Sequence, residues 1–137
     1  MSATEQLIEL SANGVVYSSI IVLGSIGLSL IYSIVGFANF AHGDTMTVGA
    51  YATLVAFGTI GGVGFSVLGL PLGFFIALIV GIVVTTVVAL VSERLVYKKM
   101  DVGSIGLLIT SIGVAFVYRA LIQAQFTTEA RRYGLDR

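Results

Sequence analysis

The chain has 137 residues, of which 57% are hydrophobic and 10% charged, and its seven basic residues balance its seven acidic ones. A soluble domain of ordinary composition is about 25% charged. The zero net charge excludes a basic surface for nucleic acid. The absence of cysteine excludes disulfide bonds, thiol chemistry and cysteine-based metal sites.

An apolar stretch fills most of the chain. Between Ser11 and Ser92 there is no Lys, Arg or Glu, and Asp44 is the only carboxylate. A core segment of a soluble protein reaches only about 10–14 apolar residues before a charge interrupts it. The sequence therefore predicts an all-α integral membrane protein, a multi-pass bundle in the cell (plasma) membrane. Residues 1–10 lack the basic residues of a secretory signal, so the first apolar run is expected to be retained.

About four spans are expected, all within a single transmembrane region, residues 1–137. At about 20 residues per crossing, the apolar runs predict spans at residues 14–35, 45–60, 71–91 and 104–118. Pro71 suits the first turn of the third helix. Arg119 is expected to close the fourth helix, and the polar residues 123–137 are expected to form a loop.

The connection at residues 93–101 is dense in charge and sets the expected orientation. It carries Arg94, Lys98 and Lys99, which the positive-inside rule places in the cytoplasm. Alternation of the spans then puts the N-terminus outside and the end of the first span on the cytoplasmic side. The tail of the chain falls outside by the same count, yet it is also basic, so the two indications conflict.

Small residues recur in rows on two of the predicted helices. Around the third span every fourth residue is small: Gly69, Gly73, Ala77, Gly81, Thr85 and Ala89. Such a ridge allows a neighbouring helix backbone to approach closely. On the first span, Tyr32 and Gly36 share a face with a row of serines: Ser18, Ser25, Ser29 and Ser33. Both rows predict helices that pack against protein.

A short polar segment, residues 39–44, lies between the first two predicted spans. Its polar side chains and the glycines beside them are Asn39, His42, Asp44, Gly36 and Gly43. Ionisable groups at membrane depth are costly and usually face a partner or a pathway. Two interpretations stay open. In one, the segment is an interfacial turn in which Asp44 or Thr45 caps the second helix. In the other, the chain unwinds inside the bundle and meets a polar solute, as in transporters with broken helices.

The remaining residues offer no arrangement for catalysis. A single histidine without cysteine excludes the ligand set of an ordinary zinc site. The GxxxxGK[ST] phosphate loop is absent, and the serines have neither a second histidine nor a paired carboxylate outside the polar segment. We therefore expect no enzyme activity, no cofactor and no metal.

Several stretches resemble one transporter family. Residues 27–44, GLSLIYSIVGFANFAHGD, and the Gly-Ala-Tyr at 49–51 are similar to the first signature region of the branched-chain amino acid ABC transporter permeases. Residues 93–97, ERLVY, and 108–113, LITSIG, are similar to later motifs of that family. The resemblance runs from residue 13 to about residue 123, and its specific part is the Asn-Phe-Ala-His-Gly string. Related permeases for urea and short amides share the pattern, so the solute stays open.

The resemblance implies a permease subunit of an ATP-driven importer for branched-chain amino acids or similar small polar solutes. The implied partners are a second permease subunit, ATPase subunits, an extracytoplasmic solute-binding protein and the lipid bilayer. Members of the family are longer, so this chain resembles their N-terminal half and is expected to be part of a larger permease bundle. Position 44 departs from the family, which commonly has Glu where this chain has Asp.

By this resemblance the polar segment becomes the expected substrate pathway, with Gly36 and Gly43 shaping the backbone around it. Asp44 is expected to attract the ammonium of a zwitterionic amino acid, while Asn39 and the start of the second helix meet its carboxylate. Two other functions stay open. One is a structural half-subunit that completes another permease chain, and the other is a passive pore for urea or short amides.

Overall fold

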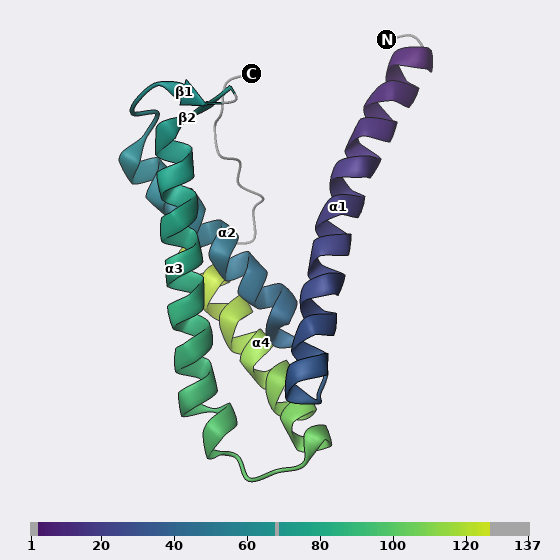
Figure 1. Cartoon of the computed structure of the whole chain (residues 1–137), viewed down its shortest axis with the longest axis vertical. Helices are drawn as coiled ribbons and strands as arrows, with labels where there is room; N and C mark the ends of the chain where they lie inside the picture. Colours follow the sequence, from purple (N-terminus) through teal and green to yellow (C-terminus); the bar gives the residue numbers. More distant parts are fainter. Residues whose placement is uncertain (1–2, 68, 127–137) are drawn as a thin grey trace.

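The structure is a computed structural model that describes residues 3–67 and 69–126. Helices dominate this part of the chain (Figure 1): α1 (Ala3–Val35), α2 (Ala41–Ile60), α3 (Leu72–Leu95) and α4 (Ser104–Phe126). A short 3₁₀ turn, η1 (Tyr97–Lys99), follows α3. The strands β1 (Ser66–Val67) and β2 (Leu70–Pro71) pair antiparallel and connect α2 to α3. The predicted all-α membrane fold is confirmed.

Each helix extends beyond its predicted span at one end. α1 begins at Ala3 and α2 at Ala41, while α3 continues to Leu95 and α4 to Phe126. The predictions followed hydropathy, but Ala, Glu and Gln are good helix formers that prolong a helix past the apolar run. The prediction that Pro71 lies in the first turn of α3 was wrong, because Pro71 precedes that turn in an extended conformation.

The expected boundary at Arg119 was also wrong, because that residue lies inside α4. Of the predicted terminal loop, residues 123–126 belong to the helix, and residues 127–137 lie outside the described part of the chain. An arginine inside an apolar helix needs a partner at the same depth, and the site below supplies one.

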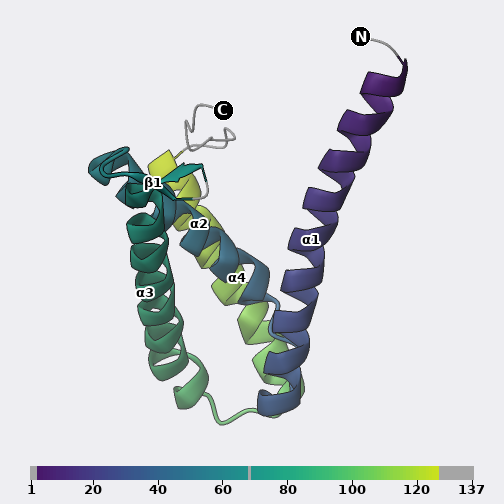
Figure 2. The same ribbon diagram turned by 45° about the horizontal axis from the view of Figure 1, so that its top comes forward.

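Three stretches of the described chain are long and apolar enough to cross a membrane: Ala3–Val35, Leu72–Lys99 and Ser104–Phe126. α2 is less apolar, because its first turn carries His42 and Asp44. It packs against both α3 and α4, and its residues Thr53 and Ala56 are buried (Figures 1 and 2). Because neighbouring helices cover part of its surface, α2 needs a less apolar surface than a helix that faces lipid on all sides.

α3 packs on α2 through a row of small buried residues, Gly73, Ala77 and Gly81. A Cβ atom added to Gly81 would collide with the hydroxyl of Thr53, so the two helices approach at glycine distance there. The sequence placed Gly69 in the same row, and this was wrong. Gly69 lies before α3 in the turn of the β-hairpin, with a φ of +80° and an exposed surface.

α1 contacts the other helices only near its C-terminal end and diverges from them toward its N-terminus (Figures 1 and 2). The contact uses Gly24 and Gly27, which lie against the side chains of Met46 and His42 of α2. The predicted serine face does not make this contact. Its serines are exposed, and Ser25 and Ser33 donate hydrogen bonds to carbonyl oxygens of α1 itself.

Candidate functional site

Gly36, three residues before the polar segment, turns the chain back toward the bundle. Gly36 ends α1 with a φ of +79°, and its N–H donates to the carbonyl oxygen of Tyr32 at 2.9 Å. This left-handed ending is the usual glycine termination of a helix. Phe37 is then only 5% exposed, and its ring packs on that of Tyr97 with centroids 5.9 Å apart. The turn therefore inserts the segment between helices.

Asn39 ties the start of α2 to η1, the turn that follows α3. Its Oδ1 accepts the N–H of Ala41 at 3.0 Å and the hydroxyl of Tyr97 at 3.3 Å. The N–H of Phe40 donates to Oγ of Ser111 in α4 at 3.0 Å. The free N–H groups at a helix start are thus satisfied by protein acceptors. The prediction that Asp44 or Thr45 caps α2 was wrong, because the helix already begins at Ala41.

Asp44 lies in the first turn of α2 and forms an ion pair with Arg119 of α4. Nε and Nη2 of Arg119 donate to Oδ1 at 3.3 and 3.2 Å, and Nη2 also donates to Oδ2 at 3.3 Å. The Asp44 side chain is 14% exposed, whereas that of Arg119 is 57% exposed. A carboxylate in the first turn also interacts favourably with the positive end of the helix dipole.

His42 and Gly43 occupy different surroundings from Asp44. The imidazole Nε2 of His42 lies 2.6 Å from the position of a Cβ on Gly27, so the ring rests directly on the α1 backbone. Gly43 is helical and exposed, with nothing within 4 Å of an added Cβ. Of the two glycines expected to shape the backbone here, Gly36 has a positive φ, whereas Gly43 has a helical backbone.

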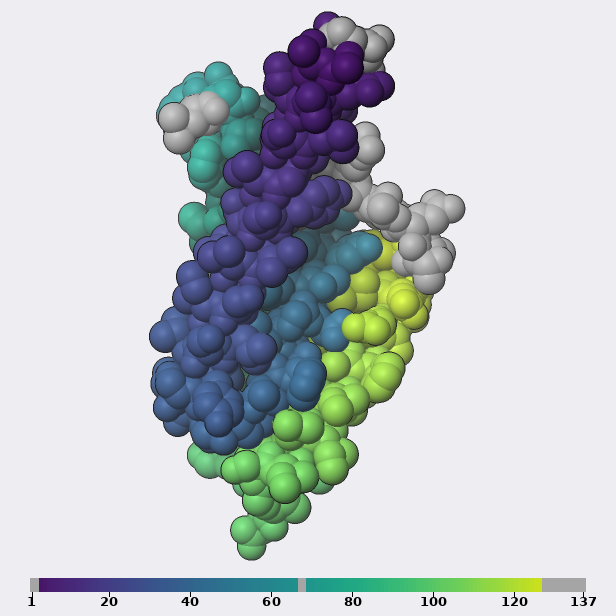
Figure 3. All heavy atoms as spheres, turned by 90° about the vertical axis from the view of Figure 1, so that its right-hand side faces the viewer, coloured from purple at the N-terminus to yellow at the C-terminus, as the bar shows by residue number. Residues whose placement is uncertain are grey.

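The polar segment lies beside the middle of α4 rather than at its end. Its partners Ser111 and Arg119 lie about 10 Å and about 22 Å along the helix from Ser104, at about 1.5 Å per residue. Figure 3 shows α1 over the start of α2, with α2 and α4 side by side next to it. Polar groups so far along an apolar helix are expected to face a partner or water, not lipid.

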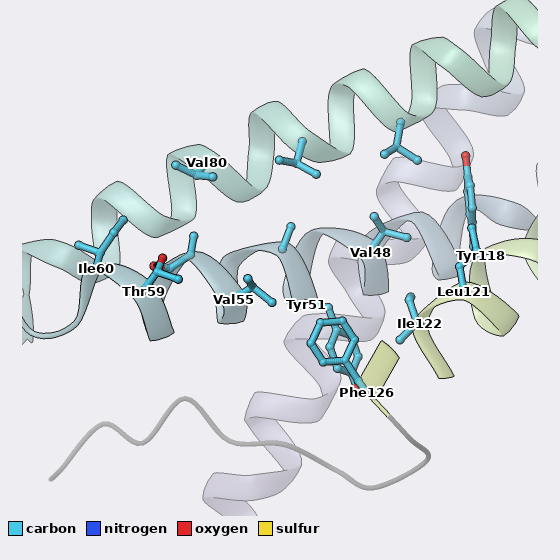
Figure 4. Close-up of a pocket in the computed structure, with 14 residues that line it drawn as sticks. Val48, Tyr51, Val55, Thr59, Ile60, Val80, Tyr118, Leu121, Ile122 and Phe126 are labelled. Atoms are coloured by element: carbon cyan, nitrogen blue, oxygen red, sulfur yellow. Dashed lines mark hydrogen bonds between the residues drawn. The ribbon is translucent and has the colours of Figure 1, made fainter. Parts of the chain in front are cut away.

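An apolar pocket of about 600 Å³ lies between α2, α3 and α4 (Figure 4). Val48 and Tyr51 line it from α2, and Tyr118, Leu121 and Ile122 line it from α4. Val48 follows Asp44 by about one turn of α2, and Ile122 follows Arg119 by about one turn of α4, so the charged pair lies about one helical turn from these two lining residues.

Sequence reasoning missed four side chains that complete the site. Ser111 and Tyr97 hold the polar segment, Arg119 pairs with Asp44, and Tyr118 is buried in hydrogen-bonding contact with Ser92 of α3. A signal existed for the ion pair. The sequence has one carboxylate in its long apolar stretch and one arginine within α4, and such charges tend to pair. Among the described residues no group of His, Asp or Glu is arranged to hold a metal ion.

Helices long and apolar enough to cross a membrane, with a polar segment held among them, are typical of membrane transport proteins. The family model "Branched-chain amino acid transport system / permease component" matches residues 10–136. The chain therefore belongs to this permease family, whose members are multi-pass proteins of the plasma membrane.

A curated relative is the high-affinity branched-chain amino acid transport system permease protein BraD of Pseudomonas aeruginosa. It is 30% identical over 119 residues, which cover 85% of this chain and 38% of the relative. The chain thus spans less than half the length of this relative. No solved structure matches the chain.

Proposed function

We propose that this chain contributes to the pathway of an ATP-driven importer for branched-chain amino acids. A second permease subunit, ATPase subunits and an extracytoplasmic solute-binding protein would complete the transporter. The family match and the printed name of the relative, a branched-chain amino acid permease, support the solute class.

The observation that carries the proposal is the depth of the polar segment. The polar segment, residues 39–44, packs beside the middle of α4, and the paired charges of Asp44 and Arg119 remain partly exposed there. Complete burial of both charges would carry a large desolvation cost, so an ion pair at this position favours surroundings that water can reach. Partial exposure at this depth fits a wall of an aqueous pathway.

Within the pathway we assign Asp44 to the ammonium of the solute. Asn39 positions the segment through Ala41 and Tyr97, and His42 sets its distance from α1 at Gly27. Gly36 provides the turn that brings the segment inward, and Gly43 leaves open space beside Asp44.

The test is ATP-dependent uptake of leucine by the complete transporter that contains this chain. We expect Asp44→Asn to reduce the uptake rate at least about tenfold, as expected for loss of a hydrogen bond to a charged group. His42→Ala is expected to reduce it less. Gly58→Ala is a matched control, since a Cβ at this helical position meets open space. Wild-type uptake by Asp44→Asn at normal expression would refute the assignment.

A further inference from the structure

Three N–H groups at the start of α2 are already occupied by protein acceptors. The N–H groups of Phe40, Ala41 and His42 already donate to Ser111 Oγ, Asn39 Oδ1 and the Asn39 carbonyl oxygen. An amino acid that uses Asp44 for its ammonium therefore needs another anion-binding group nearby.

Arg119 is such a group, and it is already at Asp44. Within the described chain its hydrogen bonds to Asp44 use Nε and Nη2, and none is formed by Nη1. More than half of its side-chain surface is exposed. A guanidinium presents donors in a planar fork that suits a carboxylate, so its exposed edge can accept the carboxylate of a solute while Asp44 stays close.

The surroundings of the pair match the rest of such a solute. The apolar pocket begins about one helical turn beyond the pair, at Val48 on α2 and Ile122 on α4. Leu121 and Ile122 line it from α4 (Figure 4). Its other walls are mostly aliphatic or aromatic side chains of α2, α3 and α4. A branched aliphatic side chain buried there would gain the usual free energy of apolar transfer.

We propose that Asp44, Arg119 and the adjoining pocket form one binding site for a zwitterionic amino acid with an aliphatic side chain. The ammonium of the solute contacts Asp44, its carboxylate contacts Arg119, and its side chain enters the pocket beside Val48. This inference rests on the proposed function and adds to it a second charged residue and a subsite for the side chain.

The charges give the site its selectivity. Asp44 and Arg119 are neutral as a pair, and a zwitterion completes a ring of four alternating charges without a net change. A solute without an ammonium group makes no contact with Asp44, and a solute without a carboxylate makes none with Arg119. We therefore expect leucine to bind more tightly than leucinamide, which lacks the carboxylate, and than 4-methylpentanoate, which lacks the ammonium.

The test is saturation-transfer NMR with the purified full chain in lipid nanodiscs and these three ligands. The wild type should bind leucine at least about tenfold more tightly than either half-ligand, as expected for one hydrogen bond to a charged group. Arg119→Gln should abolish the advantage of leucine over leucinamide. Asp44→Asn should abolish its advantage over 4-methylpentanoate. Arg94→Gln, which removes an exposed arginine at the end of α3, is the control and should bind like the wild type.

Three outcomes would overturn the proposal: no leucine binding by the wild type, an unchanged ligand ranking in both variants, or an equal loss of all ligands in both. Arg119→Lys and Val48→Phe extend the test if neutralisation prevents folding. The first should retain the ranking, and the second should weaken leucine binding far more than alanine binding. The opposite results reject the site.

This measurement also separates the site from the transport function. It needs neither ATPase nor binding protein. Leucine import by the complete transporter without leucine binding by this chain would reject the site alone. Leucine binding with the expected ranking but no ATP-dependent import would reject the transport function alone.

Discussion

Asp44 and Arg119 are 75 positions apart in the chain, yet their side chains join the first turn of α2 to the middle of α4. The carboxylate is mostly buried, and the guanidinium is 57% exposed. The pair therefore links two helices and also presents charge to whatever fills the space beside α4.

The unequal burial of the pair predicts unequal effects of removing each partner. Arg119→Gln leaves the mostly buried Asp44 carboxylate unpaired and should destabilise the chain more than Asp44→Asn, which leaves the exposed guanidinium in contact with water. The double variant Asp44→Asn/Arg119→Gln leaves no unpaired charge. A double-mutant cycle followed by thermal unfolding in detergent should give a coupling of about 1 kcal/mol, the value for a partly exposed pair. Strictly additive effects would show that the pair contributes nothing to stability.

The contact between α2 and α3 predicts a large effect at Gly81. Gly81→Ala places a methyl group against Thr53 and the Gly49 carbonyl oxygen, so the helices must separate. We expect a loss of about 1–3 kcal/mol, the usual cost of overpacking. Gly58→Ala is the control, because a Cβ there meets nothing within 4 Å. The check is the unfolding temperature of each variant. Equal stability of Gly81→Ala and Gly58→Ala would contradict the packing of α3 on α2.

The turn at the end of α1 predicts a purely conformational cost. A Cβ at Gly36 has open space, but its φ of +79° disfavours any other residue. Gly36→Ala should therefore lose about 1–2 kcal/mol, and Gly36→Asn less, because Asn tolerates the left-handed region. Gly43→Ala, at a helical and open position, should not destabilise the chain. Unfolding temperatures of the three variants provide the check.

The contact of α1 predicts a specific cross-link. A Cβ at Gly24 would lie 3.6 Å from Sδ of Met46, and the chain has no cysteine of its own. Gly24→Cys with Met46→Cys should cross-link readily with a short bifunctional thiol reagent, as judged by a mobility shift on gels after cleavage between α1 and α2. Ile26→Cys with Met46→Cys is the comparison, since Ile26 is exposed. Equal cross-linking of both pairs would mean that α1 packs on another face.

The sequence predicted the class of fold well because hydropathy is averaged over many residues. Asp44 and His42 were singled out because a polar side chain in an apolar run is conspicuous, and the structure places both in the first turn of α2. Their partners were harder to predict. Arg119 was assigned to a helix end because the sequence does not show which residues of a helix will meet a neighbouring helix. Only the packing of α2 on α4 brings Arg119 to Asp44.

The capping of α2 shows a second limit. Asp44 has the residue type of a helix cap, but Asn39 accepts the first N–H and the helix starts at Ala41. The start of α2 is fixed by hydrogen bonds of Asn39 with Tyr97 and of Phe40 with Ser111. These residues are distant in sequence, so no local pattern contained the information. For the same reason hydropathy did not show that Gly69 belongs to a hairpin turn.

The central claim is that the polar segment lines an aqueous solute pathway. Gly43→Cys tests it with little perturbation, because Gly43 is exposed and a Cβ there meets open space. We would measure its rate of reaction with a membrane-impermeant thiol reagent in the complete transporter, with and without leucine. Phe116→Cys, on the exposed face of α4, is the lipid-facing control. The account predicts rapid labelling of Gly43→Cys that leucine slows, and labelling as slow as that of Phe116→Cys would contradict it.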